Sequence, residues 1–258
     1  MNKIVHSECV TYMQQEICAE TIDLTVTSPP YDDMRNYEGY TFNYEAIADQ
    51  LYRVTKTGGV VVWVVGDKIQ NGRTLTSYRQ ALYFQKIGFA VHDVMIYHKS
   101  NTPFMRSNAY TNAYEYMFIF SKGKPKTFNA LQVETKQSGF RKNGALYNKG
   151  ADGKNRKRDI VYNERKTKTN IWTYATGLHG TTSDRYAFEH PAMFPEKLAE
   201  DHILSWSNPT ELILDPMCGS GTTLKMAQKH NRKYIGIDMS KKYVEIAKKR
   251  VAQEVLPL

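Results

Sequence analysis

Residues 27–31, Thr-Ser-Pro-Pro-Tyr, have types and an order that could hold a flat substrate bearing an amino group. They follow an apolar run at 22–26, and proline neither donates to a strand ladder nor permits helix in the residue before it. The carbonyl groups beside the prolines are then available as acceptors, with the Ser28 hydroxyl on one side and the Tyr31 ring on the other. The same residues also suit a plain turn, so this segment alone leaves both interpretations open.

A second motif lies near the C-terminus, where the apolar run 212–214 leads into Asp-Pro-Met-Cys-Gly-Ser-Gly-Thr at 215–222. The pattern predicts a strand, a tight glycine turn and a helix, and glycine lets the backbone approach a ligand closely. It lacks the lysine of a phosphate-binding loop. It is also a poor dinucleotide fingerprint, because the third glycine would fall at Leu224.

A further short strand is expected at 234–237, and it ends at Asp238, 23 residues after Asp215. An acid at the end of the second strand of a β-α-β unit is placed to hold ribose hydroxyls. The C-terminal quarter therefore predicts a site that binds a nucleoside and has no loop for binding pyrophosphate. S-adenosylmethionine is a nucleoside of this kind.

The elements that must position these motifs alternate between strand and helix. Short apolar runs predict strands at 22–26, 60–65, 91–97, 116–120, 211–214 and 234–237. Helical periodicity predicts helices at 44–54, 74–87, 195–206, 222–230 and 241–255. The expected fold is an α/β, doubly wound, mostly parallel sheet, and 258 residues can bury its core as one domain.

Together these motifs resemble the exocyclic-amino DNA methyltransferases, which modify N4 of cytosine or N6 of adenine. Residues 27–31 match the family's (Asp/Asn/Ser)-Pro-Pro-(Tyr/Phe) signature, and 215–222 match its cofactor loop. Segments 52–65, 115–123 and 190–198 resemble further motifs of the family. The order, catalytic loop first, is that of the permuted β group. One departure is Ser-Glu-Cys at 7–9, where the family pattern leads us to expect Gly-Asp-Cys.

The resemblance implies methyl transfer from S-adenosylmethionine to the amine of a base flipped out of duplex DNA. The Ser28 hydroxyl and the Pro29 carbonyl would accept the amine hydrogens and localise its lone pair, while Tyr31 stacks on the base. No covalent intermediate or metal is needed. The candidate catalytic residues are Ser28, Pro29, Pro30 and Tyr31. The candidate cofactor residues are Glu8, Phe194, Asp215, Pro216, Cys218, Gly219, Gly221, Thr222 and Asp238.

The target atom and the alternative functions follow from the same residues. Serine at position 28 favours cytosine N4, because adenine enzymes more often carry Asp or Asn there, and adenine N6 stays the alternative. Methylation at cytosine C5 is disfavoured, because it uses a Pro-Cys nucleophile and no cysteine here follows a proline. More remote alternatives are a nicotinamide-dependent oxidoreductase and a non-catalytic DNA-binding protein of this fold, and RNA is open on charge alone.

The net charge of +9 and pI near 9.2 favour a polyanionic partner. Ten Lys/Arg and three acids lie between 141 and 168, where the resembled family inserts its DNA-recognition region. We therefore expect one methyltransferase domain, 1–258, with an inserted target-recognition region at 129–180 that contacts phosphate. The candidate DNA-binding residues are Arg141, Lys142, Lys154, Arg156, Lys157, Arg158, Arg165 and Lys166.

The remaining expectations concern cellular context. The sequence shows no apolar stretch near the ~20 residues that span a bilayer and no signal-peptide pattern. Three cysteines without metal spacing fit a reducing compartment. We expect a cytoplasmic protein, nucleoid-associated in a bacterium or phage, with double-stranded DNA as partner and no membrane. A restriction nuclease would be a separate chain, and monomer and homodimer both stay open.

Overall fold

The computed structural model describes residues 2–30, 42–69, 71–102, 107–135, 146–158, 163–190 and 192–253. Contacts divide the chain into two compact units. The larger unit consists of Met1–Asn129 and Asn170–Leu258, and the smaller unit is Ala130–Thr169.

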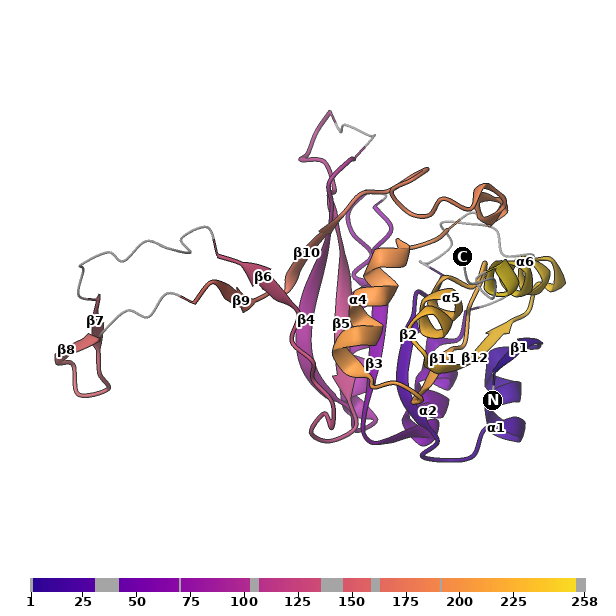
Figure 1. Ribbon diagram of the computed structural model, residues 1–258, viewed down its shortest axis with the longest axis horizontal. Coiled ribbons are helices and arrows are strands. Elements are labelled where there is room, and N and C mark those ends of the chain that lie inside the picture. The colour runs from indigo at the N-terminus through magenta and orange to yellow at the C-terminus, as the bar shows by residue number, and fades with distance from the viewer. Residues whose placement is uncertain are drawn as a thin grey trace. The chain divides into compact units, whose positions relative to one another are not determined.

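The larger unit is built on a sheet that has eight strands within the described residues (Figure 1). In sheet order they are β1 (Lys3–His6), β12 (Lys233–Asp238), β11 (Leu212–Asp215), β2 (Ile22–Thr27), β3 (Thr55–Val65), β5 (Tyr114–Ser121), β4 (Ala90–Lys99) and β10 (Ile171–Tyr174). Strand β5 is antiparallel to both of its neighbours, and the other pairs are parallel. The mostly parallel α/β sheet predicted from the sequence is confirmed.

Two groups of helices cover the two faces of this sheet (Figure 1). Helices α1 (Cys9–Glu16), α2 (Tyr44–Val54) and α3 (Thr76–Lys86) lie on one face. Helices α4 (Glu196–Trp206), α5 (Thr222–Lys229) and α6 (Lys241–Ala252) lie on the other, preceded by the 3-10 helix η1 (Arg185–Glu189). Central strands buried on both sides read as continuous apolar runs, which explains the Val-Val-Val-Trp-Val-Val of β3.

Besides η1, three elements of the larger unit were not predicted: β1, α1 and β10. Strand β1 is short and polar at both ends, and α1 is capped by Glu8, whose carboxylate accepts hydrogen bonds from the N–H groups of Val10 and Thr11. Strand β10 alternates exposed and buried residues and pairs with β4. Because β10 belongs to the main sheet, the smaller compact unit ends at Thr169, before the end of the recognition region expected at 129–180.

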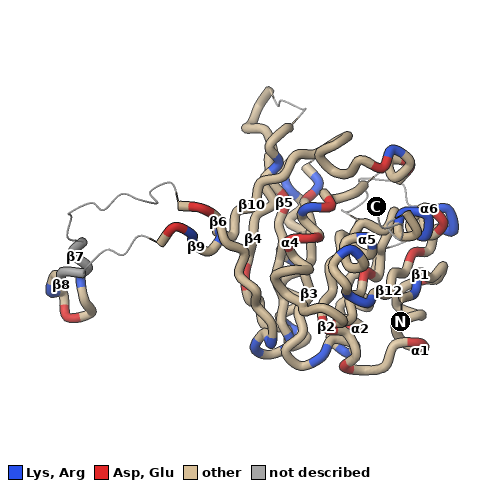
Figure 2. The backbone as a smooth tube through the Cα atoms, viewed as in Figure 1, with Lys and Arg blue, Asp and Glu red and all other residues tan. Residues whose placement is uncertain are grey.

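The smaller unit contains four short strands within its described residues, none of which was predicted from the sequence. Strand β6 (Gln132–Glu134) pairs antiparallel with β9 (Arg165–Thr167). Strand β7 (Leu146–Lys149) pairs antiparallel with β8 (Asn155–Arg158), and Gly153 supplies a positive φ of 74° in the turn between them. Figure 2 marks the basic residues of β9 and of the β7–β8 turn in blue.

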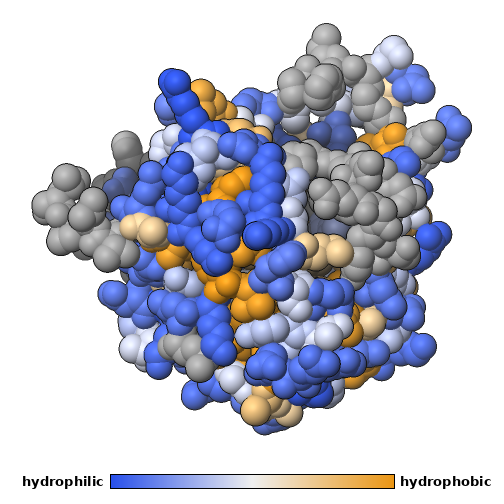
Figure 3. Space-filling model, turned by 90° about the vertical axis from the view of Figure 1, so that its right-hand side faces the viewer, coloured by the Kyte–Doolittle hydropathy of each residue, from blue (hydrophilic) through white to orange (hydrophobic). Residues whose placement is uncertain are grey.

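No helix in the described part of the chain is long and apolar enough to cross a membrane. The face of the molecule seen in Figure 3 is largely hydrophilic, with apolar residues gathered in a central band.

Candidate active site

The two sequence motifs meet at one edge of the larger unit, because parallel strands present their carboxyl ends together. Strands β2, β11 and β12 end there in Thr27, Asp215 and Asp238. A cavity of about 720 Å³ opens at this edge. Its volume is typical of small-molecule sites, and such sites lie where strand connections diverge in doubly wound sheets.

The Ser-Pro-Pro-Tyr loop contributes Ser28, Pro29 and Pro30 to the cavity wall, and Tyr31 lies outside the described residues. The preceding Thr27 is fully buried and donates its hydroxyl to Asp215 Oδ1 at 2.8 Å. A second bond runs in the opposite direction: the Thr223 hydroxyl of α5 donates to the carbonyl of Val26 in β2 at 3.0 Å. Two buried hydrogen bonds thus join the end of β2 to the residues on either side of the glycine loop, and neither could be predicted from the motifs alone.

The glycine loop lines the cavity next to the end of β12. The Gly219 N–H donates to Asp238 Oδ2 at 2.8 Å, and the Ser240 N–H donates to Asp238 Oδ1 at the same distance. These bonds hold the carboxylate in the cavity wall, where the sequence predicted a ribose contact. Gly221, also expected to bind cofactor, is not among the described lining residues. It packs against α6, where a Cβ would lie 2.8 Å from Ala247 Cβ.

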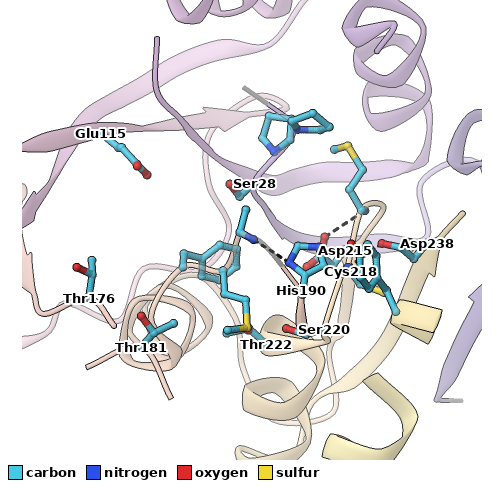
Figure 4. Close-up of a pocket in the computed structure, with 18 of the residues that line it drawn as sticks. Ser28, Glu115, Thr176, Thr181, His190, Asp215, Cys218, Ser220, Thr222 and Asp238 are labelled. Atoms are coloured by element: carbon cyan, nitrogen blue, oxygen red, sulfur yellow. Dashed lines mark hydrogen bonds between the residues drawn. The ribbon is translucent and has the colours of Figure 1, made fainter. Parts of the chain in front are cut away.

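The cavity also contains the other candidate cofactor residues. Those that line it are Glu8, Phe194, Asp215, Pro216, Cys218, Gly219, Thr222 and Asp238. Figure 4 shows Cys218 and Asp238 on one side of Ser28, with Glu115, Thr176 and Thr181 on the other. Glu8 lines the cavity while its carboxylate caps α1, so the group expected to reach adenosine already holds two backbone N–H groups.

Two cysteines line the cavity, and both are poor nucleophiles. Burial raises the pKa of the Cys218 thiol well above its ordinary value, and nearby Asp215 and Asp238 add to the effect. Burial, together with Glu8, likewise raises the pKa of the Cys9 thiol. A protonated thiol does not attack carbon as a thiolate does. The site therefore favours a mechanism without a covalent cysteine intermediate.

His190 positions the glycine loop, a role that the sequence did not reveal. Its ring meets Tyr243 edge-on at 4.4 Å between centroids, and Nδ1 accepts the Ala192 N–H at 3.2 Å. A Cβ added at Gly219 would lie 2.6 Å from His190 Nε2, and Gly219 has a φ of +49°. The histidine thus packs where only glycine fits.

Gly219→Ala should weaken binding of the expected cofactor, S-adenosylmethionine, about tenfold and lower the free energy of unfolding by about 1–2 kcal/mol, because both φ and the His190 contact become strained. Calorimetric titration and urea unfolding measure the two effects. The matched control is Gly153→Ala, which has φ +74° and nothing within 4 Å of the added Cβ. Equal cofactor affinity in Gly219→Ala and wild type would contradict the role given to this glycine.

Asp215 has an unusual titration because of its burial. Burial raises its pKa to about 6, although the Thr27 hydroxyl and the Met217 N–H donate hydrogen bonds to it. A raised pKa means that the native state holds the proton more tightly than the unfolded chain does. Ionisation of Asp215 therefore lowers stability progressively as pH rises from about 4 to about 6, and the loss is constant above that range.

Asp215→Asn removes this titration. The stability of wild type relative to the variant should fall by about 3 kcal/mol between pH 4 and pH 7, which corresponds to the shift of about two pKa units. Urea unfolding of both proteins from pH 4 to pH 8 measures the difference at each pH. A difference that stays constant over the whole range would exclude a raised pKa at this position.

A buried ionic network joins two walls of the cavity, and sequence reasoning missed it. Arg250 of α6 is fully buried and donates to the Ser220 carbonyl and hydroxyl at 3.0 Å. Its guanidinium also pairs with Asp184 at 3.0 Å and Glu196 at 2.5 Å. Lys225 contacts both acids at 3.0 Å. The two cations and two anions thereby link the glycine loop to the segment that carries His190 and Phe194.

The candidate DNA-binding residues belong to the smaller unit. Lys154, Arg165 and Lys166 are exposed. The backbone of residues 156–158 belongs to β8. Arg141 and Lys142 lie outside the described residues.

Comparison with known proteins connects this geometry to a family. A model of DNA methylases designated N6/N4 matches residues 22–249. The orphan methyltransferase M.BamHII of Bacillus amyloliquefaciens is 53% identical over 252 residues, 95% of this chain and 94% of that protein. PvuII DNA methyltransferase (cytosine-N4-specific) has a similar fold, with a TM-score of 0.71, 18% identity and coverage of 97% of this chain and 86% of that one. The M1.HpyAVI–SAM complex has a TM-score of 0.63, 24% identity and coverage of 97% and 100%.

Proposed function

Because this chain belongs to the DNA methylase family and is a DNA methyltransferase of its N6/N4 class, we propose that it methylates N4 of cytosine in duplex DNA, with S-adenosylmethionine as methyl donor. The observation that carries the proposal is the meeting of Ser28-Pro29-Pro30 and the glycine loop in one cavity. Family membership sets aside the oxidoreductase alternative. A separate restriction nuclease and the choice between monomer and homodimer stay predictions.

The composition of the cavity fits this cofactor. Among its described lining residues, Lys99 is the sole Lys or Arg, whereas Glu8, Glu115, Asp215 and Asp238 supply carboxyl groups. The negative charge of such a wall favours a cationic nucleoside and disfavours the anionic pyrophosphate of a dinucleotide. Asp238 would hold the ribose hydroxyls, and Phe194 would pack against the methionine end.

The residues of the catalytic loop would activate the amine. S-adenosylmethionine supplies a methyl group on a cationic sulfonium, and the carbon–sulfur bond breaks as the nitrogen–carbon bond forms. The exocyclic amine is a poor nucleophile, because its lone pair is delocalised into the ring. The Ser28 hydroxyl and the Pro29 carbonyl would accept its two hydrogens and favour a tetrahedral nitrogen in the transition state. One of these protons then leaves to solvent.

The choice of cytosine rests on Ser28, because Asp or Asn is more common at this position in adenine enzymes. A protein of similar fold is described as cytosine-N4-specific. Adenine N6 is the alternative with the same mechanism. Nucleoside mass spectrometry of duplex DNA treated with protein and S-adenosylmethionine separates the two. N4-methylcytosine is the expected product, N6-methyladenine would change the base, and no methylated base would contradict methyl transfer to DNA.

We also propose that the smaller unit contacts DNA phosphate and helps to select the target sequence. Its exposed Lys154, Arg165 and Lys166 carry the charge expected of such a surface. Replacing all three by glutamine should weaken duplex binding and reduce the slope of log K against log salt by about 2–3. Fluorescence anisotropy at several salt concentrations measures both. The matched control replaces exposed Lys86, Lys124 and Lys248 of the larger unit. Equal slopes in the two triple variants would contradict the assignment.

A further inference from the structure

The order of the strands divides the cavity into two halves. Strands β11 and β12 lie on one side of β2 and carry the glycine loop and Asp238. Strands β3, β5, β4 and β10 lie on the other side. Ser28 follows β2, so it stands between the two halves, as Figure 4 shows for Asp238 and Glu115. With the cofactor on the β11–β12 side, the substrate must occupy the other side.

The geometry of in-line attack determines which part of the base lies on the β3–β5–β4–β10 side of the cavity. The amine nitrogen must stand between the methyl group and the base ring, while Ser28 holds its hydrogens. The ring therefore extends from Ser28 away from the glycine loop. The cavity wall at that end is formed by Tyr97 and Lys99 of β4 and by Glu115 of β5. Tyr97 and Glu115 are directly paired in the sheet and share one face with Lys99, two residues further along β4.

This wall carries an ion pair that has no role in the proposed activation of the amine by Ser28 and Pro29. Lys99 Nζ lies 2.5 Å from Glu115 Oε1, and the two side chains are 26% and 13% exposed. The ammonium has three N–H donors, and Glu115 is its hydrogen-bond partner within the described residues, which leaves two donors for a ligand or water. A ligand that displaces water from such a pair without hydrogen-bonding to it would incur a desolvation penalty.

A second polar group in the same wall is also unsatisfied. Tyr97 is 2% exposed, and its hydroxyl has no hydrogen-bond partner among the described residues. Buried polar groups are nearly always paired with protein, water or ligand. An apolar ring edge at this place would leave the Tyr97 hydroxyl without a partner and two Lys99 N–H groups without an acceptor, so the wall fits a ring edge rich in acceptors.

Building on the proposed function, we infer that the Lys99 ammonium, oriented by Glu115, donates to N3 and O2 of the flipped base and thereby makes the site specific for cytosine. On cytosine, the edge next to the amine presents two acceptors, N3 and O2. Adenine presents N1 and then a C–H group, which cannot accept. The pair thus supports a cytosine bound by its amine at Ser28 and discriminates against adenine in the same position.

The test uses duplexes whose target cytosine is replaced by 3-deazacytosine, in which C–H replaces N3. Wild type and Lys99→Met/Glu115→Gln are compared, because the double variant removes both charges and leaves neither uncompensated. The ratio of kcat/KM on cytosine to kcat/KM on the analogue should be about 10- to 100-fold larger for wild type than for the double variant. The analogue's intrinsic reactivity cancels in this comparison of ratios. Lys99→Arg, which keeps a cationic donor, should recover part of the loss.

The outcomes separate this inference from the proposed function. S-adenosylmethionine affinity and thermal unfolding, measured for every variant, show that the cavity is intact, and exposed Lys86→Met is the matched control. An equal cytosine-to-analogue ratio in wild type and double variant would overturn the contact with N3. N6-methyladenine as the wild-type product would overturn the cytosine reading but keep methyl transfer. No methylated base from wild type would instead contradict the proposed function itself.

Discussion

Ser28→Ala is expected to lower kcat by about 10²- to 10³-fold, the usual effect of removing one hydrogen-bonding group that stabilises charge in a transition state. Ser28 lines the cavity at the end of β2, where its hydroxyl would accept an amine hydrogen. The loss should fall on kcat rather than on the KM for S-adenosylmethionine, because the proposed cofactor residues of the glycine loop and Asp238 follow β11 and β12, away from Ser28.

Single-turnover methylation and calorimetric titration of S-adenosylmethionine measure the two quantities separately. Ser28→Asn keeps an acceptor oxygen and should recover part of the activity that Ser28→Ala loses. Ser183→Ala, at an exposed position of the larger unit, is the matched control. A kcat for Ser28→Ala close to that of wild type would remove Ser28 from the mechanism.

Arg250→Met is expected to lower the free energy of unfolding by about 3–5 kcal/mol, the usual result of removing one partner from a buried ion network. Asp184 and Glu196 would keep Lys225 as their cation, and the Ser220 carbonyl would lose its guanidinium donor. Because Ser220 lines the cavity, S-adenosylmethionine affinity should fall as well. Urea unfolding and calorimetric titration measure the two losses.

A double-mutant cycle identifies the network as the cause. Arg250→Met and Glu196→Gln should each destabilise the protein, and the double variant should lose less than their sum, because the two residues share one interaction. Lys248→Met on the exposed face of α6 is the matched control. Additive losses would mean that the Arg250–Glu196 contact makes no coupled contribution to stability.

Local patterns were sufficient for most of the fold. The helix expected at 44–54 is α2 with the same bounds, and the six expected strands are present with ends displaced by a few residues. These elements are long or strongly apolar, so a short window of sequence contains the information that determines them. The pairing of a Ser-Pro-Pro-Tyr loop with a glycine loop likewise depends on residues adjacent in the chain, and it predicted the family.

Tertiary structure decided what depends on residues far apart in sequence. Strand β10 is four residues long and becomes a strand through its pairing with β4, so its membership of the main sheet was missed. Arg250 is separated from Ser220 by 30 residues and from Asp184 by 66, and a basic residue in the last turn of a helix is ordinarily exposed. Its burial requires four charges to converge in the folded chain. The sequence alone predicted the long or strongly apolar strands and helices and the two loop motifs, because both are local. Only the fold decided what surrounds them: the Arg250 network behind the glycine loop and the Lys99–Glu115 pair beyond Ser28.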